Sequence, residues 1–553
     1  MFESDRMGFS TYSEIRGDDQ FRTLTSRFGT LGNTSYSLDL DYQHNDGVRP
    51  NNELSRLEWY STIKQQLTPR DSVLLLSKYQ DYHSGDNFQR FDQSNVRTNY
   101  AYDELERPTL AAGYHRQWSP GAHTLFLATR LEKEQRFSDT EADRLAVIKD
   151  TNGVVAPFPP QEFPFDISYR SEFEIYGAEL NQILQRDRHS LVLGGSFQSG
   201  SFETSDRLAL GAGFSTNPFY SVIFSNPPTE RVTRESYERF SGYGYYTLEA
   251  HRNLHVTGGV AYDQVKFPEN HRDSPIAPGA TRRDQAGPKA ALVWTPARNV
   301  TLRGAYSRAL GGVSIDETYR LEPTQLAGFN QSLQTVISES LVGSISAPTI
   351  EIAGVALDAK LKSRTYFGIQ AELLQSDVDR EIGVYDFIVD VSNPLRPANR
   401  ATTLQRLDYE ERSIVTTLNR LISDEWSCGA RYRFIRSELR TIHPALPTST
   451  VFDSDRTERA DLHRAELFAL FNHPSGFFAR ADTAWYHQSN SRHPSEDFFQ
   501  SNALFGYRFW DRRAELSFGM LNINDADYRL NPLTPYSELP RERTVVVRVK
   551  INL

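Results

Sequence analysis

Charged side chains recur at every second position in several segments of this chain. Two-residue spacing places side chains on one face of a β-strand. Such a face can bind an anionic partner or substrate. Pairing with acidic residues is the favoured interpretation, because an unpaired charge away from bulk water is costly. The expected cations are Arg431, Arg433, Arg480, Arg508, Arg548 and Lys550, and their expected partners are Asp39, Asp41, Glu58 and Asp482.

Acidic residues cluster at Asp453, Asp455, Glu458 and Asp461. Carboxylates are good ligands for a hard cation such as Ca²⁺, but this spacing does not fit an EF-hand loop. A solvated acidic face is therefore the favoured interpretation, and we predict no metal site here.

Residues for catalysis or cofactor binding form no recognisable set. The 13 His residues include no pair at zinc-ligand spacing, and the single Cys excludes a disulfide framework and a Cys-rich metal site. We find no Ser-His-Asp arrangement, carboxylate dyad or Gly-rich phosphate loop. The sequence therefore predicts no enzyme and no cofactor. The formal net charge of −10 argues against nucleic acid as a partner.

The element that must position the charges is a strand with one apolar and one polar face. The C-terminal segment shows this most clearly, because its two parities differ in chemistry. One parity is polar and cationic apart from Val546, and the other is wholly aliphatic. The aliphatic residues, which we predict to face lipid, are Val545, Val547, Val549, Ile551 and Leu553.

The same alternation recurs along the chain, for example in residues 36–42, 57–67, 125–132, 426–434 and 503–509. Many of these runs approach roughly nine to eleven residues, the length that crosses a bilayer at a tilt. A soluble sheet with one wet face is the alternative, but soluble strands average about five or six residues. We therefore predict an all-β, transmembrane antiparallel β-barrel in the bacterial outer membrane, with charged residues facing a wet lumen.

Composition agrees with a barrel. Hydrophobic residues make up 38% of the 553 residues, mean hydropathy is −0.55, and no apolar run approaches the roughly 20 residues of a membrane helix. The 27 Tyr and 33 Phe suit aromatic girdles at the two membrane interfaces. Cys428 is expected to be a small apolar residue that faces lipid.

Short turns alternate with long polar stretches. Two strands at the ends, 7–16 and 542–553, and ten hairpins between them bring the count to about 22 strands in one domain over residues 1–553. Short turns then lie on the periplasmic side together with both termini, and long loops lie outside the cell. The long stretches are 138–165, 204–234, 268–285, 311–348, 379–400, 441–459 and 524–541.

The longest of these loops contains a run of apolar residues at helical spacing. Residues 324–342 therefore predict a short helix. Packing on the rim of the barrel is the favoured position for it, and insertion over the mouth or into the lumen is the alternative.

Three segments resemble the TonB-dependent receptor family. Residues 287–296 and 299–308, with Tyr306-Ser307-Arg308, are similar to its central hairpin and the strand that leads into a long loop. Residues 519–529, ending in Asp527-Tyr528, resemble its penultimate strand and turn, and Val545 to Leu553 resembles its final strand. Outer-membrane proteins usually end in Phe or Trp, whereas this chain ends in Leu553. The resemblance covers essentially the whole chain.

The resemblance implies a receptor that imports a scarce solute, such as a metal chelate, a vitamin or an oligosaccharide. It also implies a plug domain, an inner-membrane energy-coupling protein, and contact with outer-membrane lipid and lipopolysaccharide. Only Met1 to Met7 precede the first expected strand, and they lack a signal-peptide pattern. We therefore expect the chain to be the C-terminal part of a longer protein.

Two other functions stay open at this point. The barrel is the pore of a larger export or assembly protein if periplasmic helical repeats take the place of a plug. It is a mount for an enzyme or adhesin if its loops carry the activity.

Overall fold

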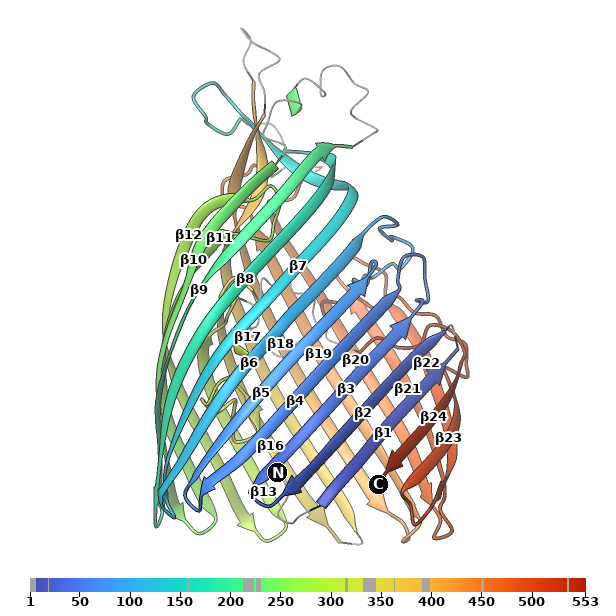
Figure 1. The fold of residues 1–553 in the computed structure, drawn as a ribbon. Coiled ribbons are helices and arrows are strands. Elements are labelled where there is room, and N and C mark those ends of the chain that lie inside the picture. Colours follow the sequence, from blue (N-terminus) through green and yellow to red (C-terminus); the bar gives the residue numbers. More distant parts are fainter. Residues whose placement is uncertain are drawn as a thin grey trace.

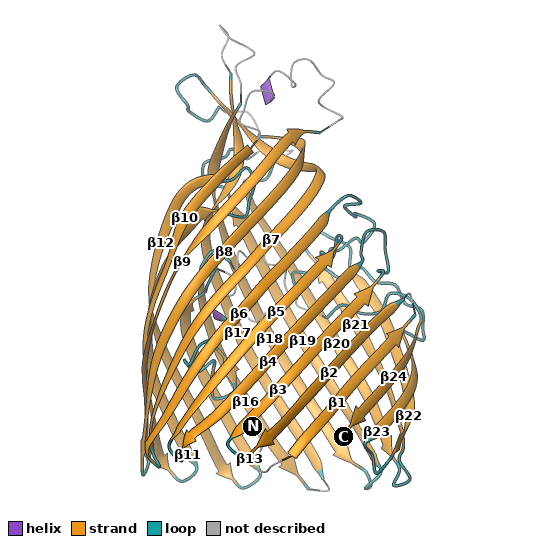
Figure 2. Ribbon diagram, in the orientation of Figure 1, coloured by secondary structure: helices purple, strands orange, loops and turns teal. Residues whose placement is uncertain are grey.

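The computed structural model describes residues 6–17, 19–156, 160–211, 223–224, 230–313, 317–331, 345–362, 364–389, 398–448, 452–534 and 537–553. Strands form nearly all of the regular structure (Figure 2). They are β1 (Arg6–Arg16), β2 (Gln20–Leu31), β3 (Thr34–Asn45), β4 (Leu54–Thr68), β5 (Asp71–Ser84), β6 (Ala101–Ser119), β7 (Ala122–Lys149), β8 (Gln161–Arg186), β9 (His189–Leu210), β10 (Glu230–His251), β11 (Leu254–Asn270), β12 (Ala277–Ala297), β13 (Val300–Leu310), β14 (Gln325–Leu326), β15 (Phe329–Asn330), β16 (Thr349–Leu361), β17 (Thr365–Ile388), β18 (Asn399–Leu421), β19 (Trp426–Ile442), β20 (Asp455–Asn472), β21 (Phe477–Asn490), β22 (Glu496–Phe509), β23 (Ala514–Leu521) and β24 (Thr544–Asn552).

Twenty-two of these strands form one closed antiparallel barrel. Each strand pairs with its neighbours in the chain, and β1 pairs with β24, with Ser10 opposite Asn552 and Arg16 opposite Val546. Closure gives every strand of the barrel a paired neighbour on both sides, as a barrel in a membrane requires. The predicted strand number and all-β class are confirmed. No helix among the described residues has the length and apolar character needed to cross a membrane.

The two ends of the barrel differ, as predicted. Short turns and both chain termini lie at one end, and the long loops lie at the other (Figure 1). On one side of the barrel, strands rise well above the rest, because β7 and β8 have 28 and 26 residues whereas β24 has 9. Several stretches predicted as loops are therefore partly strand, namely parts of 138–165, 204–234, 268–285 and 379–400.

The reason for these errors is that the apolar parity reverses along the tall strands. In the lower part of β8, Tyr176 and Leu180 point outward and are 55% and 54% exposed. In its upper part the opposite parity is apolar, and Phe165, Ile167 and Tyr169 are buried inside the barrel. A strand whose apolar face changes sides does not show one continuous alternation. The reversal marks the level at which the outward face stops being apolar.

The tall walls meet above the barrel. β7 and β17 lie eight positions apart in the wall, yet Ala146–Lys149 and Tyr385–Ile388 pair as parallel strands. Lys149 Nζ and Asp386 Oδ2 lie 2.6 Å apart, and the Phe165 ring stacks on Tyr385 at 4.8 Å. The tops of β7 and β8 are thus joined to β17 across the long-loop end of the barrel.

Candidate functional site

A large cavity opens at the end of the barrel that carries the long loops. Its volume is about 1430 Å³. Its described wall comes from the long-loop ends of β5 to β8 and β17 to β20, and from the loops that follow β5, β11, β19, β21 and β23. The loops that build it are far apart in the sequence and meet at this end of the barrel.

The described lining of this mouth cavity combines cations with aromatic rings. Guanidinium groups bind carboxylates or phosphates with two parallel hydrogen bonds, and aromatic faces contact planar ligands or cations. Carboxylates from Asp92, Asp139, Asp143, Glu162, Asp273 and Glu458 balance part of the positive charge. The cations are Arg90, Arg97, Arg144, Arg272, Arg380, Arg456 and Arg529, and the rings are Tyr82, Phe88, Phe91, Tyr100, Tyr102, Phe137 and Phe452.

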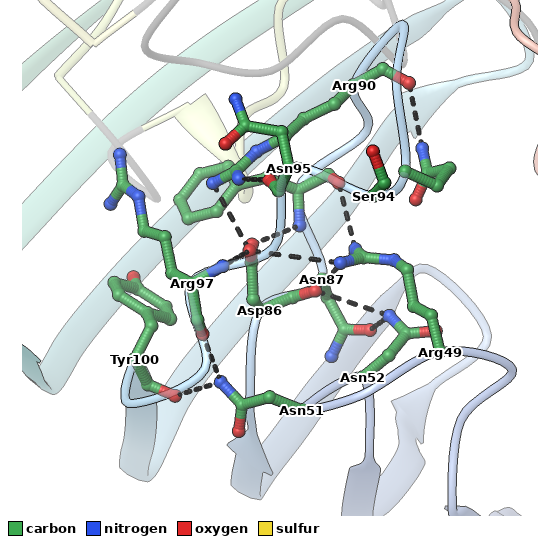
Figure 3. Close-up of polar contacts among 12 residues, drawn as sticks. Arg49, Asn51, Asn52, Asp86, Asn87, Arg90, Ser94, Asn95, Arg97 and Tyr100 are labelled. Atoms are coloured by element: carbon green, nitrogen blue, oxygen red, sulfur yellow. Dashed lines mark hydrogen bonds and ion pairs between the residues drawn. The ribbon is translucent and has the colours of Figure 1, made fainter.

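One wall of the mouth cavity, residues 85–100, is built around the buried carboxylate of Asp86 (Figure 3). Asp86 accepts hydrogen bonds from the backbone N–H of Phe88 at 3.3 Å and of Arg97 at 2.8 Å. Its Oδ2 also lies 3.2 Å from Arg90 and 3.8 Å from Arg49. A single side chain therefore ties both ends of this loop to two guanidinium groups.

Further contacts join the same loop to its neighbours. Asn51 Nδ2 donates to the carbonyl oxygens of Arg97 at 2.6 Å and Tyr100 at 2.8 Å (Figure 3). The Arg97 guanidinium donates to Asp139 at 2.9 Å and lies 5.6 Å from the Phe88 ring centroid. Residues 85–100 are thus held at a fixed position that presents Arg90 and Arg97 to the cavity.

Burial lowers the pKa of Arg49 and of Arg90 below the usual range, and the charge of Asp86 acts against this effect. A guanidinium stays protonated at neutral pH despite such a shift. Two guanidinium groups, those of Arg49 and Arg90, therefore lie close to the single carboxylate of Asp86.

His271 lies directly behind the cavity wall, next to Arg272. Its ring contacts Phe202 with centroids 5.3 Å apart, and its carbonyl oxygen accepts a hydrogen bond from Tyr169. Burial, reinforced by the charges of Arg272, lowers the pKa of His271 to about 4, while Asp273 acts in the opposite direction.

Acid is expected to destabilise this loop. An unfolded His titrates near pH 6.5, so the free energy of unfolding is unaffected by His271 above about pH 6.5. It decreases as the pH falls toward about 4, by up to roughly 3 kcal/mol, because the unfolded chain then binds a proton that buried His271 does not. Thermal melts of the purified protein in detergent at neutral pH and near pH 5 measure the loss. His271→Phe keeps a ring but cannot titrate, so its melting temperature should fall less; an equal fall in both proteins would contradict the assignment.

The structure pairs most of the charged residues that the sequence singled out. Arg480 lies 2.9 Å from Asp482, Arg508 lies 2.8 Å from Glu515, and Arg548 lies 2.5 Å from Glu14. In register, Arg431 lies opposite Glu466, Arg433 opposite Arg464, and Lys550 opposite Glu515. Arg433 is also close to Glu411.

The apolar residues of β24 occupy the opposite face of that strand. Val545, Val549 and Leu553 are 55%, 37% and 61% exposed. Val547 and Ile551 share their parity and are half-buried. Cys428, on β19, is also half-buried. None of the predicted lumen-facing cations lines the mouth cavity, because they lie on the lower wall toward the short turns, whereas Glu458 of the acidic cluster does line it.

Two sequence-based pairings are wrong. Asp41 pairs with Arg22 and Arg56 rather than with the predicted cations, and Glu58 lies 4.0 Å from Lys78. Adjacent strands supply nearer partners than distant ones, which sequence order does not reveal. The four carboxylates of the acidic cluster each pair with a different arginine: Asp453 with Arg492, Asp455 with Arg440, Glu458 with Arg456 and Asp461 with Arg436.

Sequence reasoning missed the mouth cavity and did not include 85–100 among the long loops. A signal was present in the composition of this stretch, where Asn, Asp, Gly and Ser accompany Arg and Phe. Such residues favour tight turns stabilised by side chains.

The sequence matches the family model described as TonB dependent receptor-like, beta-barrel, over residues 3–343. The chain belongs to this family. TonB-dependent receptor-like barrels lie in the bacterial outer membrane, and the predicted localisation is therefore confirmed. No curated protein matches the sequence of this receptor-like barrel significantly.

Solved structures of low sequence identity share the fold of this receptor-like barrel. The unliganded ferric citrate transporter FecA is 12% identical and has a TM-score of 0.65, with 99% of this chain and 78% of FecA covered. The copper transporter OprC is 10% identical with a TM-score of 0.64, covering 100% and 81% of the two chains. The siderophore receptor PiuA from Acinetobacter baumannii is 12% identical with a TM-score of 0.63, covering 100% and 82%.

Proposed function

We propose that this receptor-like barrel takes up an anionic metal chelate through the outer membrane. The observation that carries the proposal is the mouth cavity, which presents arginines and aromatic rings to the outside on a loop held in place by Asp86. An anionic chelate suits such a lining better than a neutral oligosaccharide, because guanidinium groups gain most from a charged acceptor. Two of the similar structures are named for ferric citrate and a siderophore, which supports a metal chelate, and a third is named for copper.

The proposal includes two further partners. An inner-membrane energy-coupling protein supplies the work of uptake, since concentrating a scarce solute costs free energy. Lipid and lipopolysaccharide contact the outward residues of the wall, including Val545, Val547, Val549, Ile551 and Leu553, while the paired charges of the lower wall face water in the lumen.

Binding by the purified protein tests the proposal. Calorimetric titration with ferric citrate, a ferric catecholate, cobalamin and a neutral oligosaccharide should detect binding of at least one anionic chelate. Arg529 lines the mouth cavity and is exposed. Arg529→Ala should therefore weaken binding of that chelate about tenfold, as expected for the loss of one charged hydrogen bond.

A matched control is Arg512→Ala, which removes the same charge from an exposed short turn at the other end of the barrel. Its affinity should equal that of the wild type. Binding of the oligosaccharide alone, or equal losses in both variants, would count against anionic solutes.

A further inference from the structure

The chain between β13 and β16 turns back into the barrel instead of staying at the rim. Hydrogen bonds from Gly311 N to Pro348 O at 2.8 Å and from Ala347 N to Gly312 O at 3.2 Å close the base of this loop near the long-loop end. Residues 317–331, here called the infolded segment, nevertheless contact Arg303. Arg303 is near the short-turn end of the barrel, because it lies three residues after Val300, where β13 begins. The segment therefore extends far down the lumen.

Polar contacts hold the first half of the infolded segment on the wall. The carboxylate of Glu179 accepts hydrogen bonds from the backbone N–H of Leu321 at 2.7 Å and of Glu322 at 3.1 Å. Tyr243 donates to Glu179 at 2.7 Å, and Tyr245 donates to Glu322 at 2.5 Å. Glu179 of β8 thus accepts from the backbone of the segment, and Tyr245 of β10 donates to the side chain of its Glu322.

The second half is the small hairpin β14–β15, which contacts β13 and β16. Arg303 donates to the Ala327 carbonyl at 3.0 Å, and its guanidinium lies 5.7 Å from the Phe329 ring centroid. Gly328 has a φ of +86°, which a glycine adopts without strain. Phe329 is 2% exposed and covers Gly354 so closely that a Cβ there would lie 2.3 Å from its ring.

The infolded segment also reaches the far side of the lumen. Tyr319 lies beside Tyr60 of β4, nine positions from β13 in a barrel of 22 strands. A pocket of about 30 Å³, enough for roughly one water molecule, lies between the segment and the wall of β7 to β10. The segment is seated against the wall and crosses much of the lumen.

We propose that the infolded segment is a built-in constriction of the lumen, which must move aside before a solute passes from the mouth cavity to the periplasmic end. A barrel of this size is wide unless something fills it. The contacts are hydrogen bonds, the ion pair of Arg239 with Glu317, and apolar packing of Leu326 and Phe329 on the wall. None of them belongs to the strand pairing, so the segment can leave the wall without breaking that pairing. The proposal concerns the lumen and holds whichever solute the cavity binds.

Conductance of the purified full chain in planar bilayers tests this proposal. Gly354→Val places a branched side chain where the Phe329 ring lies and should expel the hairpin, so the open conductance should rise several-fold over the wild type. Gly304→Val is the matched control, because Gly304 lies opposite Val355, which is 63% exposed, and its Cβ would meet nothing closer than 3.8 Å. Its conductance should equal that of the wild type.

Phe329→Ala is a second variant that should release the hairpin from the wall, since it removes the ring and leaves the wall unchanged. It should raise the conductance in the same direction, and it decides the question if Gly354→Val does not fold. The proposal is overturned if folded Phe329→Ala conducts like the wild type, or if the wild type already conducts as much as the variants. Neither result bears on solute affinity at the mouth cavity, so the two proposals can fail separately.

Discussion

Val547→Arg is expected to prevent assembly of the barrel in the outer membrane. Val547 lies in the middle of β24, opposite Ile15 and Phe518, which are 56% and 42% exposed on the same face. A cation on a lipid-contacting face near the bilayer midplane costs about 2–4 kcal/mol. Heat-modifiable migration in gels and the amount of protein in outer-membrane fractions measure the folded yield, which should fall strongly.

Arg548→Ser is the matched control, one residue further along the same strand. Arg548 pairs with Glu14, but Glu14 also contacts Arg16 at 2.6 Å and accepts a hydrogen bond from Tyr12 at 2.6 Å. Its carboxylate therefore keeps partners in the variant, and the folded yield should stay near that of the wild type. The opposite order of the two yields would show that the inner and outer faces have been assigned the wrong way round.

Asp86→Ala is expected to release loop 85–100 and abolish solute binding at the mouth. Removing one partner of a buried ion pair costs about 3–5 kcal/mol, because the other charge is left without compensation. The side chain of Arg49 is only 6% exposed, so it would be stranded in this way. Trypsin should then cleave the variant after Arg90 or Arg97 much faster than the wild type, while the strands of the barrel stay resistant.

Asp92→Ala changes the same type of residue within the same loop. Within the part of the chain that the structure describes, the hydrogen bonds that Asp92 accepts come from Ser94, through its backbone N–H at 3.0 Å and its hydroxyl at 2.7 Å. Its loss should leave the cleavage rate nearly unchanged. Equal cleavage of the Asp86 and Asp92 variants would mean that Asp86 does not hold the loop.

The predicted helix in the longest loop shows where local reasoning failed. Residues 324–342 have apolar residues at helical spacing, but Gln325–Leu326 and Phe329–Asn330 form a hairpin, and 332–344 lie outside the described residues. Leu326 and Phe329 are apolar because they pack on the barrel wall on either side of a tight turn. Contacts with Tyr243 and Gly354 decide the conformation, and neither is near in sequence.

The charged residues of the lower wall show a similar division. Their alternation along each strand identified one polar face, but their partners depend on register. Glu14 and Arg548 are 534 residues apart in the chain and meet only because the barrel closes.

Sequence by itself determined the β-barrel, its number of strands, the end that carries the long loops and the family. These properties follow from a two-residue period that each strand must show when its faces meet different surroundings. Only the tertiary structure decided where the tall strands meet, how Asp86 assembles a binding wall and how the longest loop enters the lumen. Those features depend on contacts between distant segments, for which no local period exists.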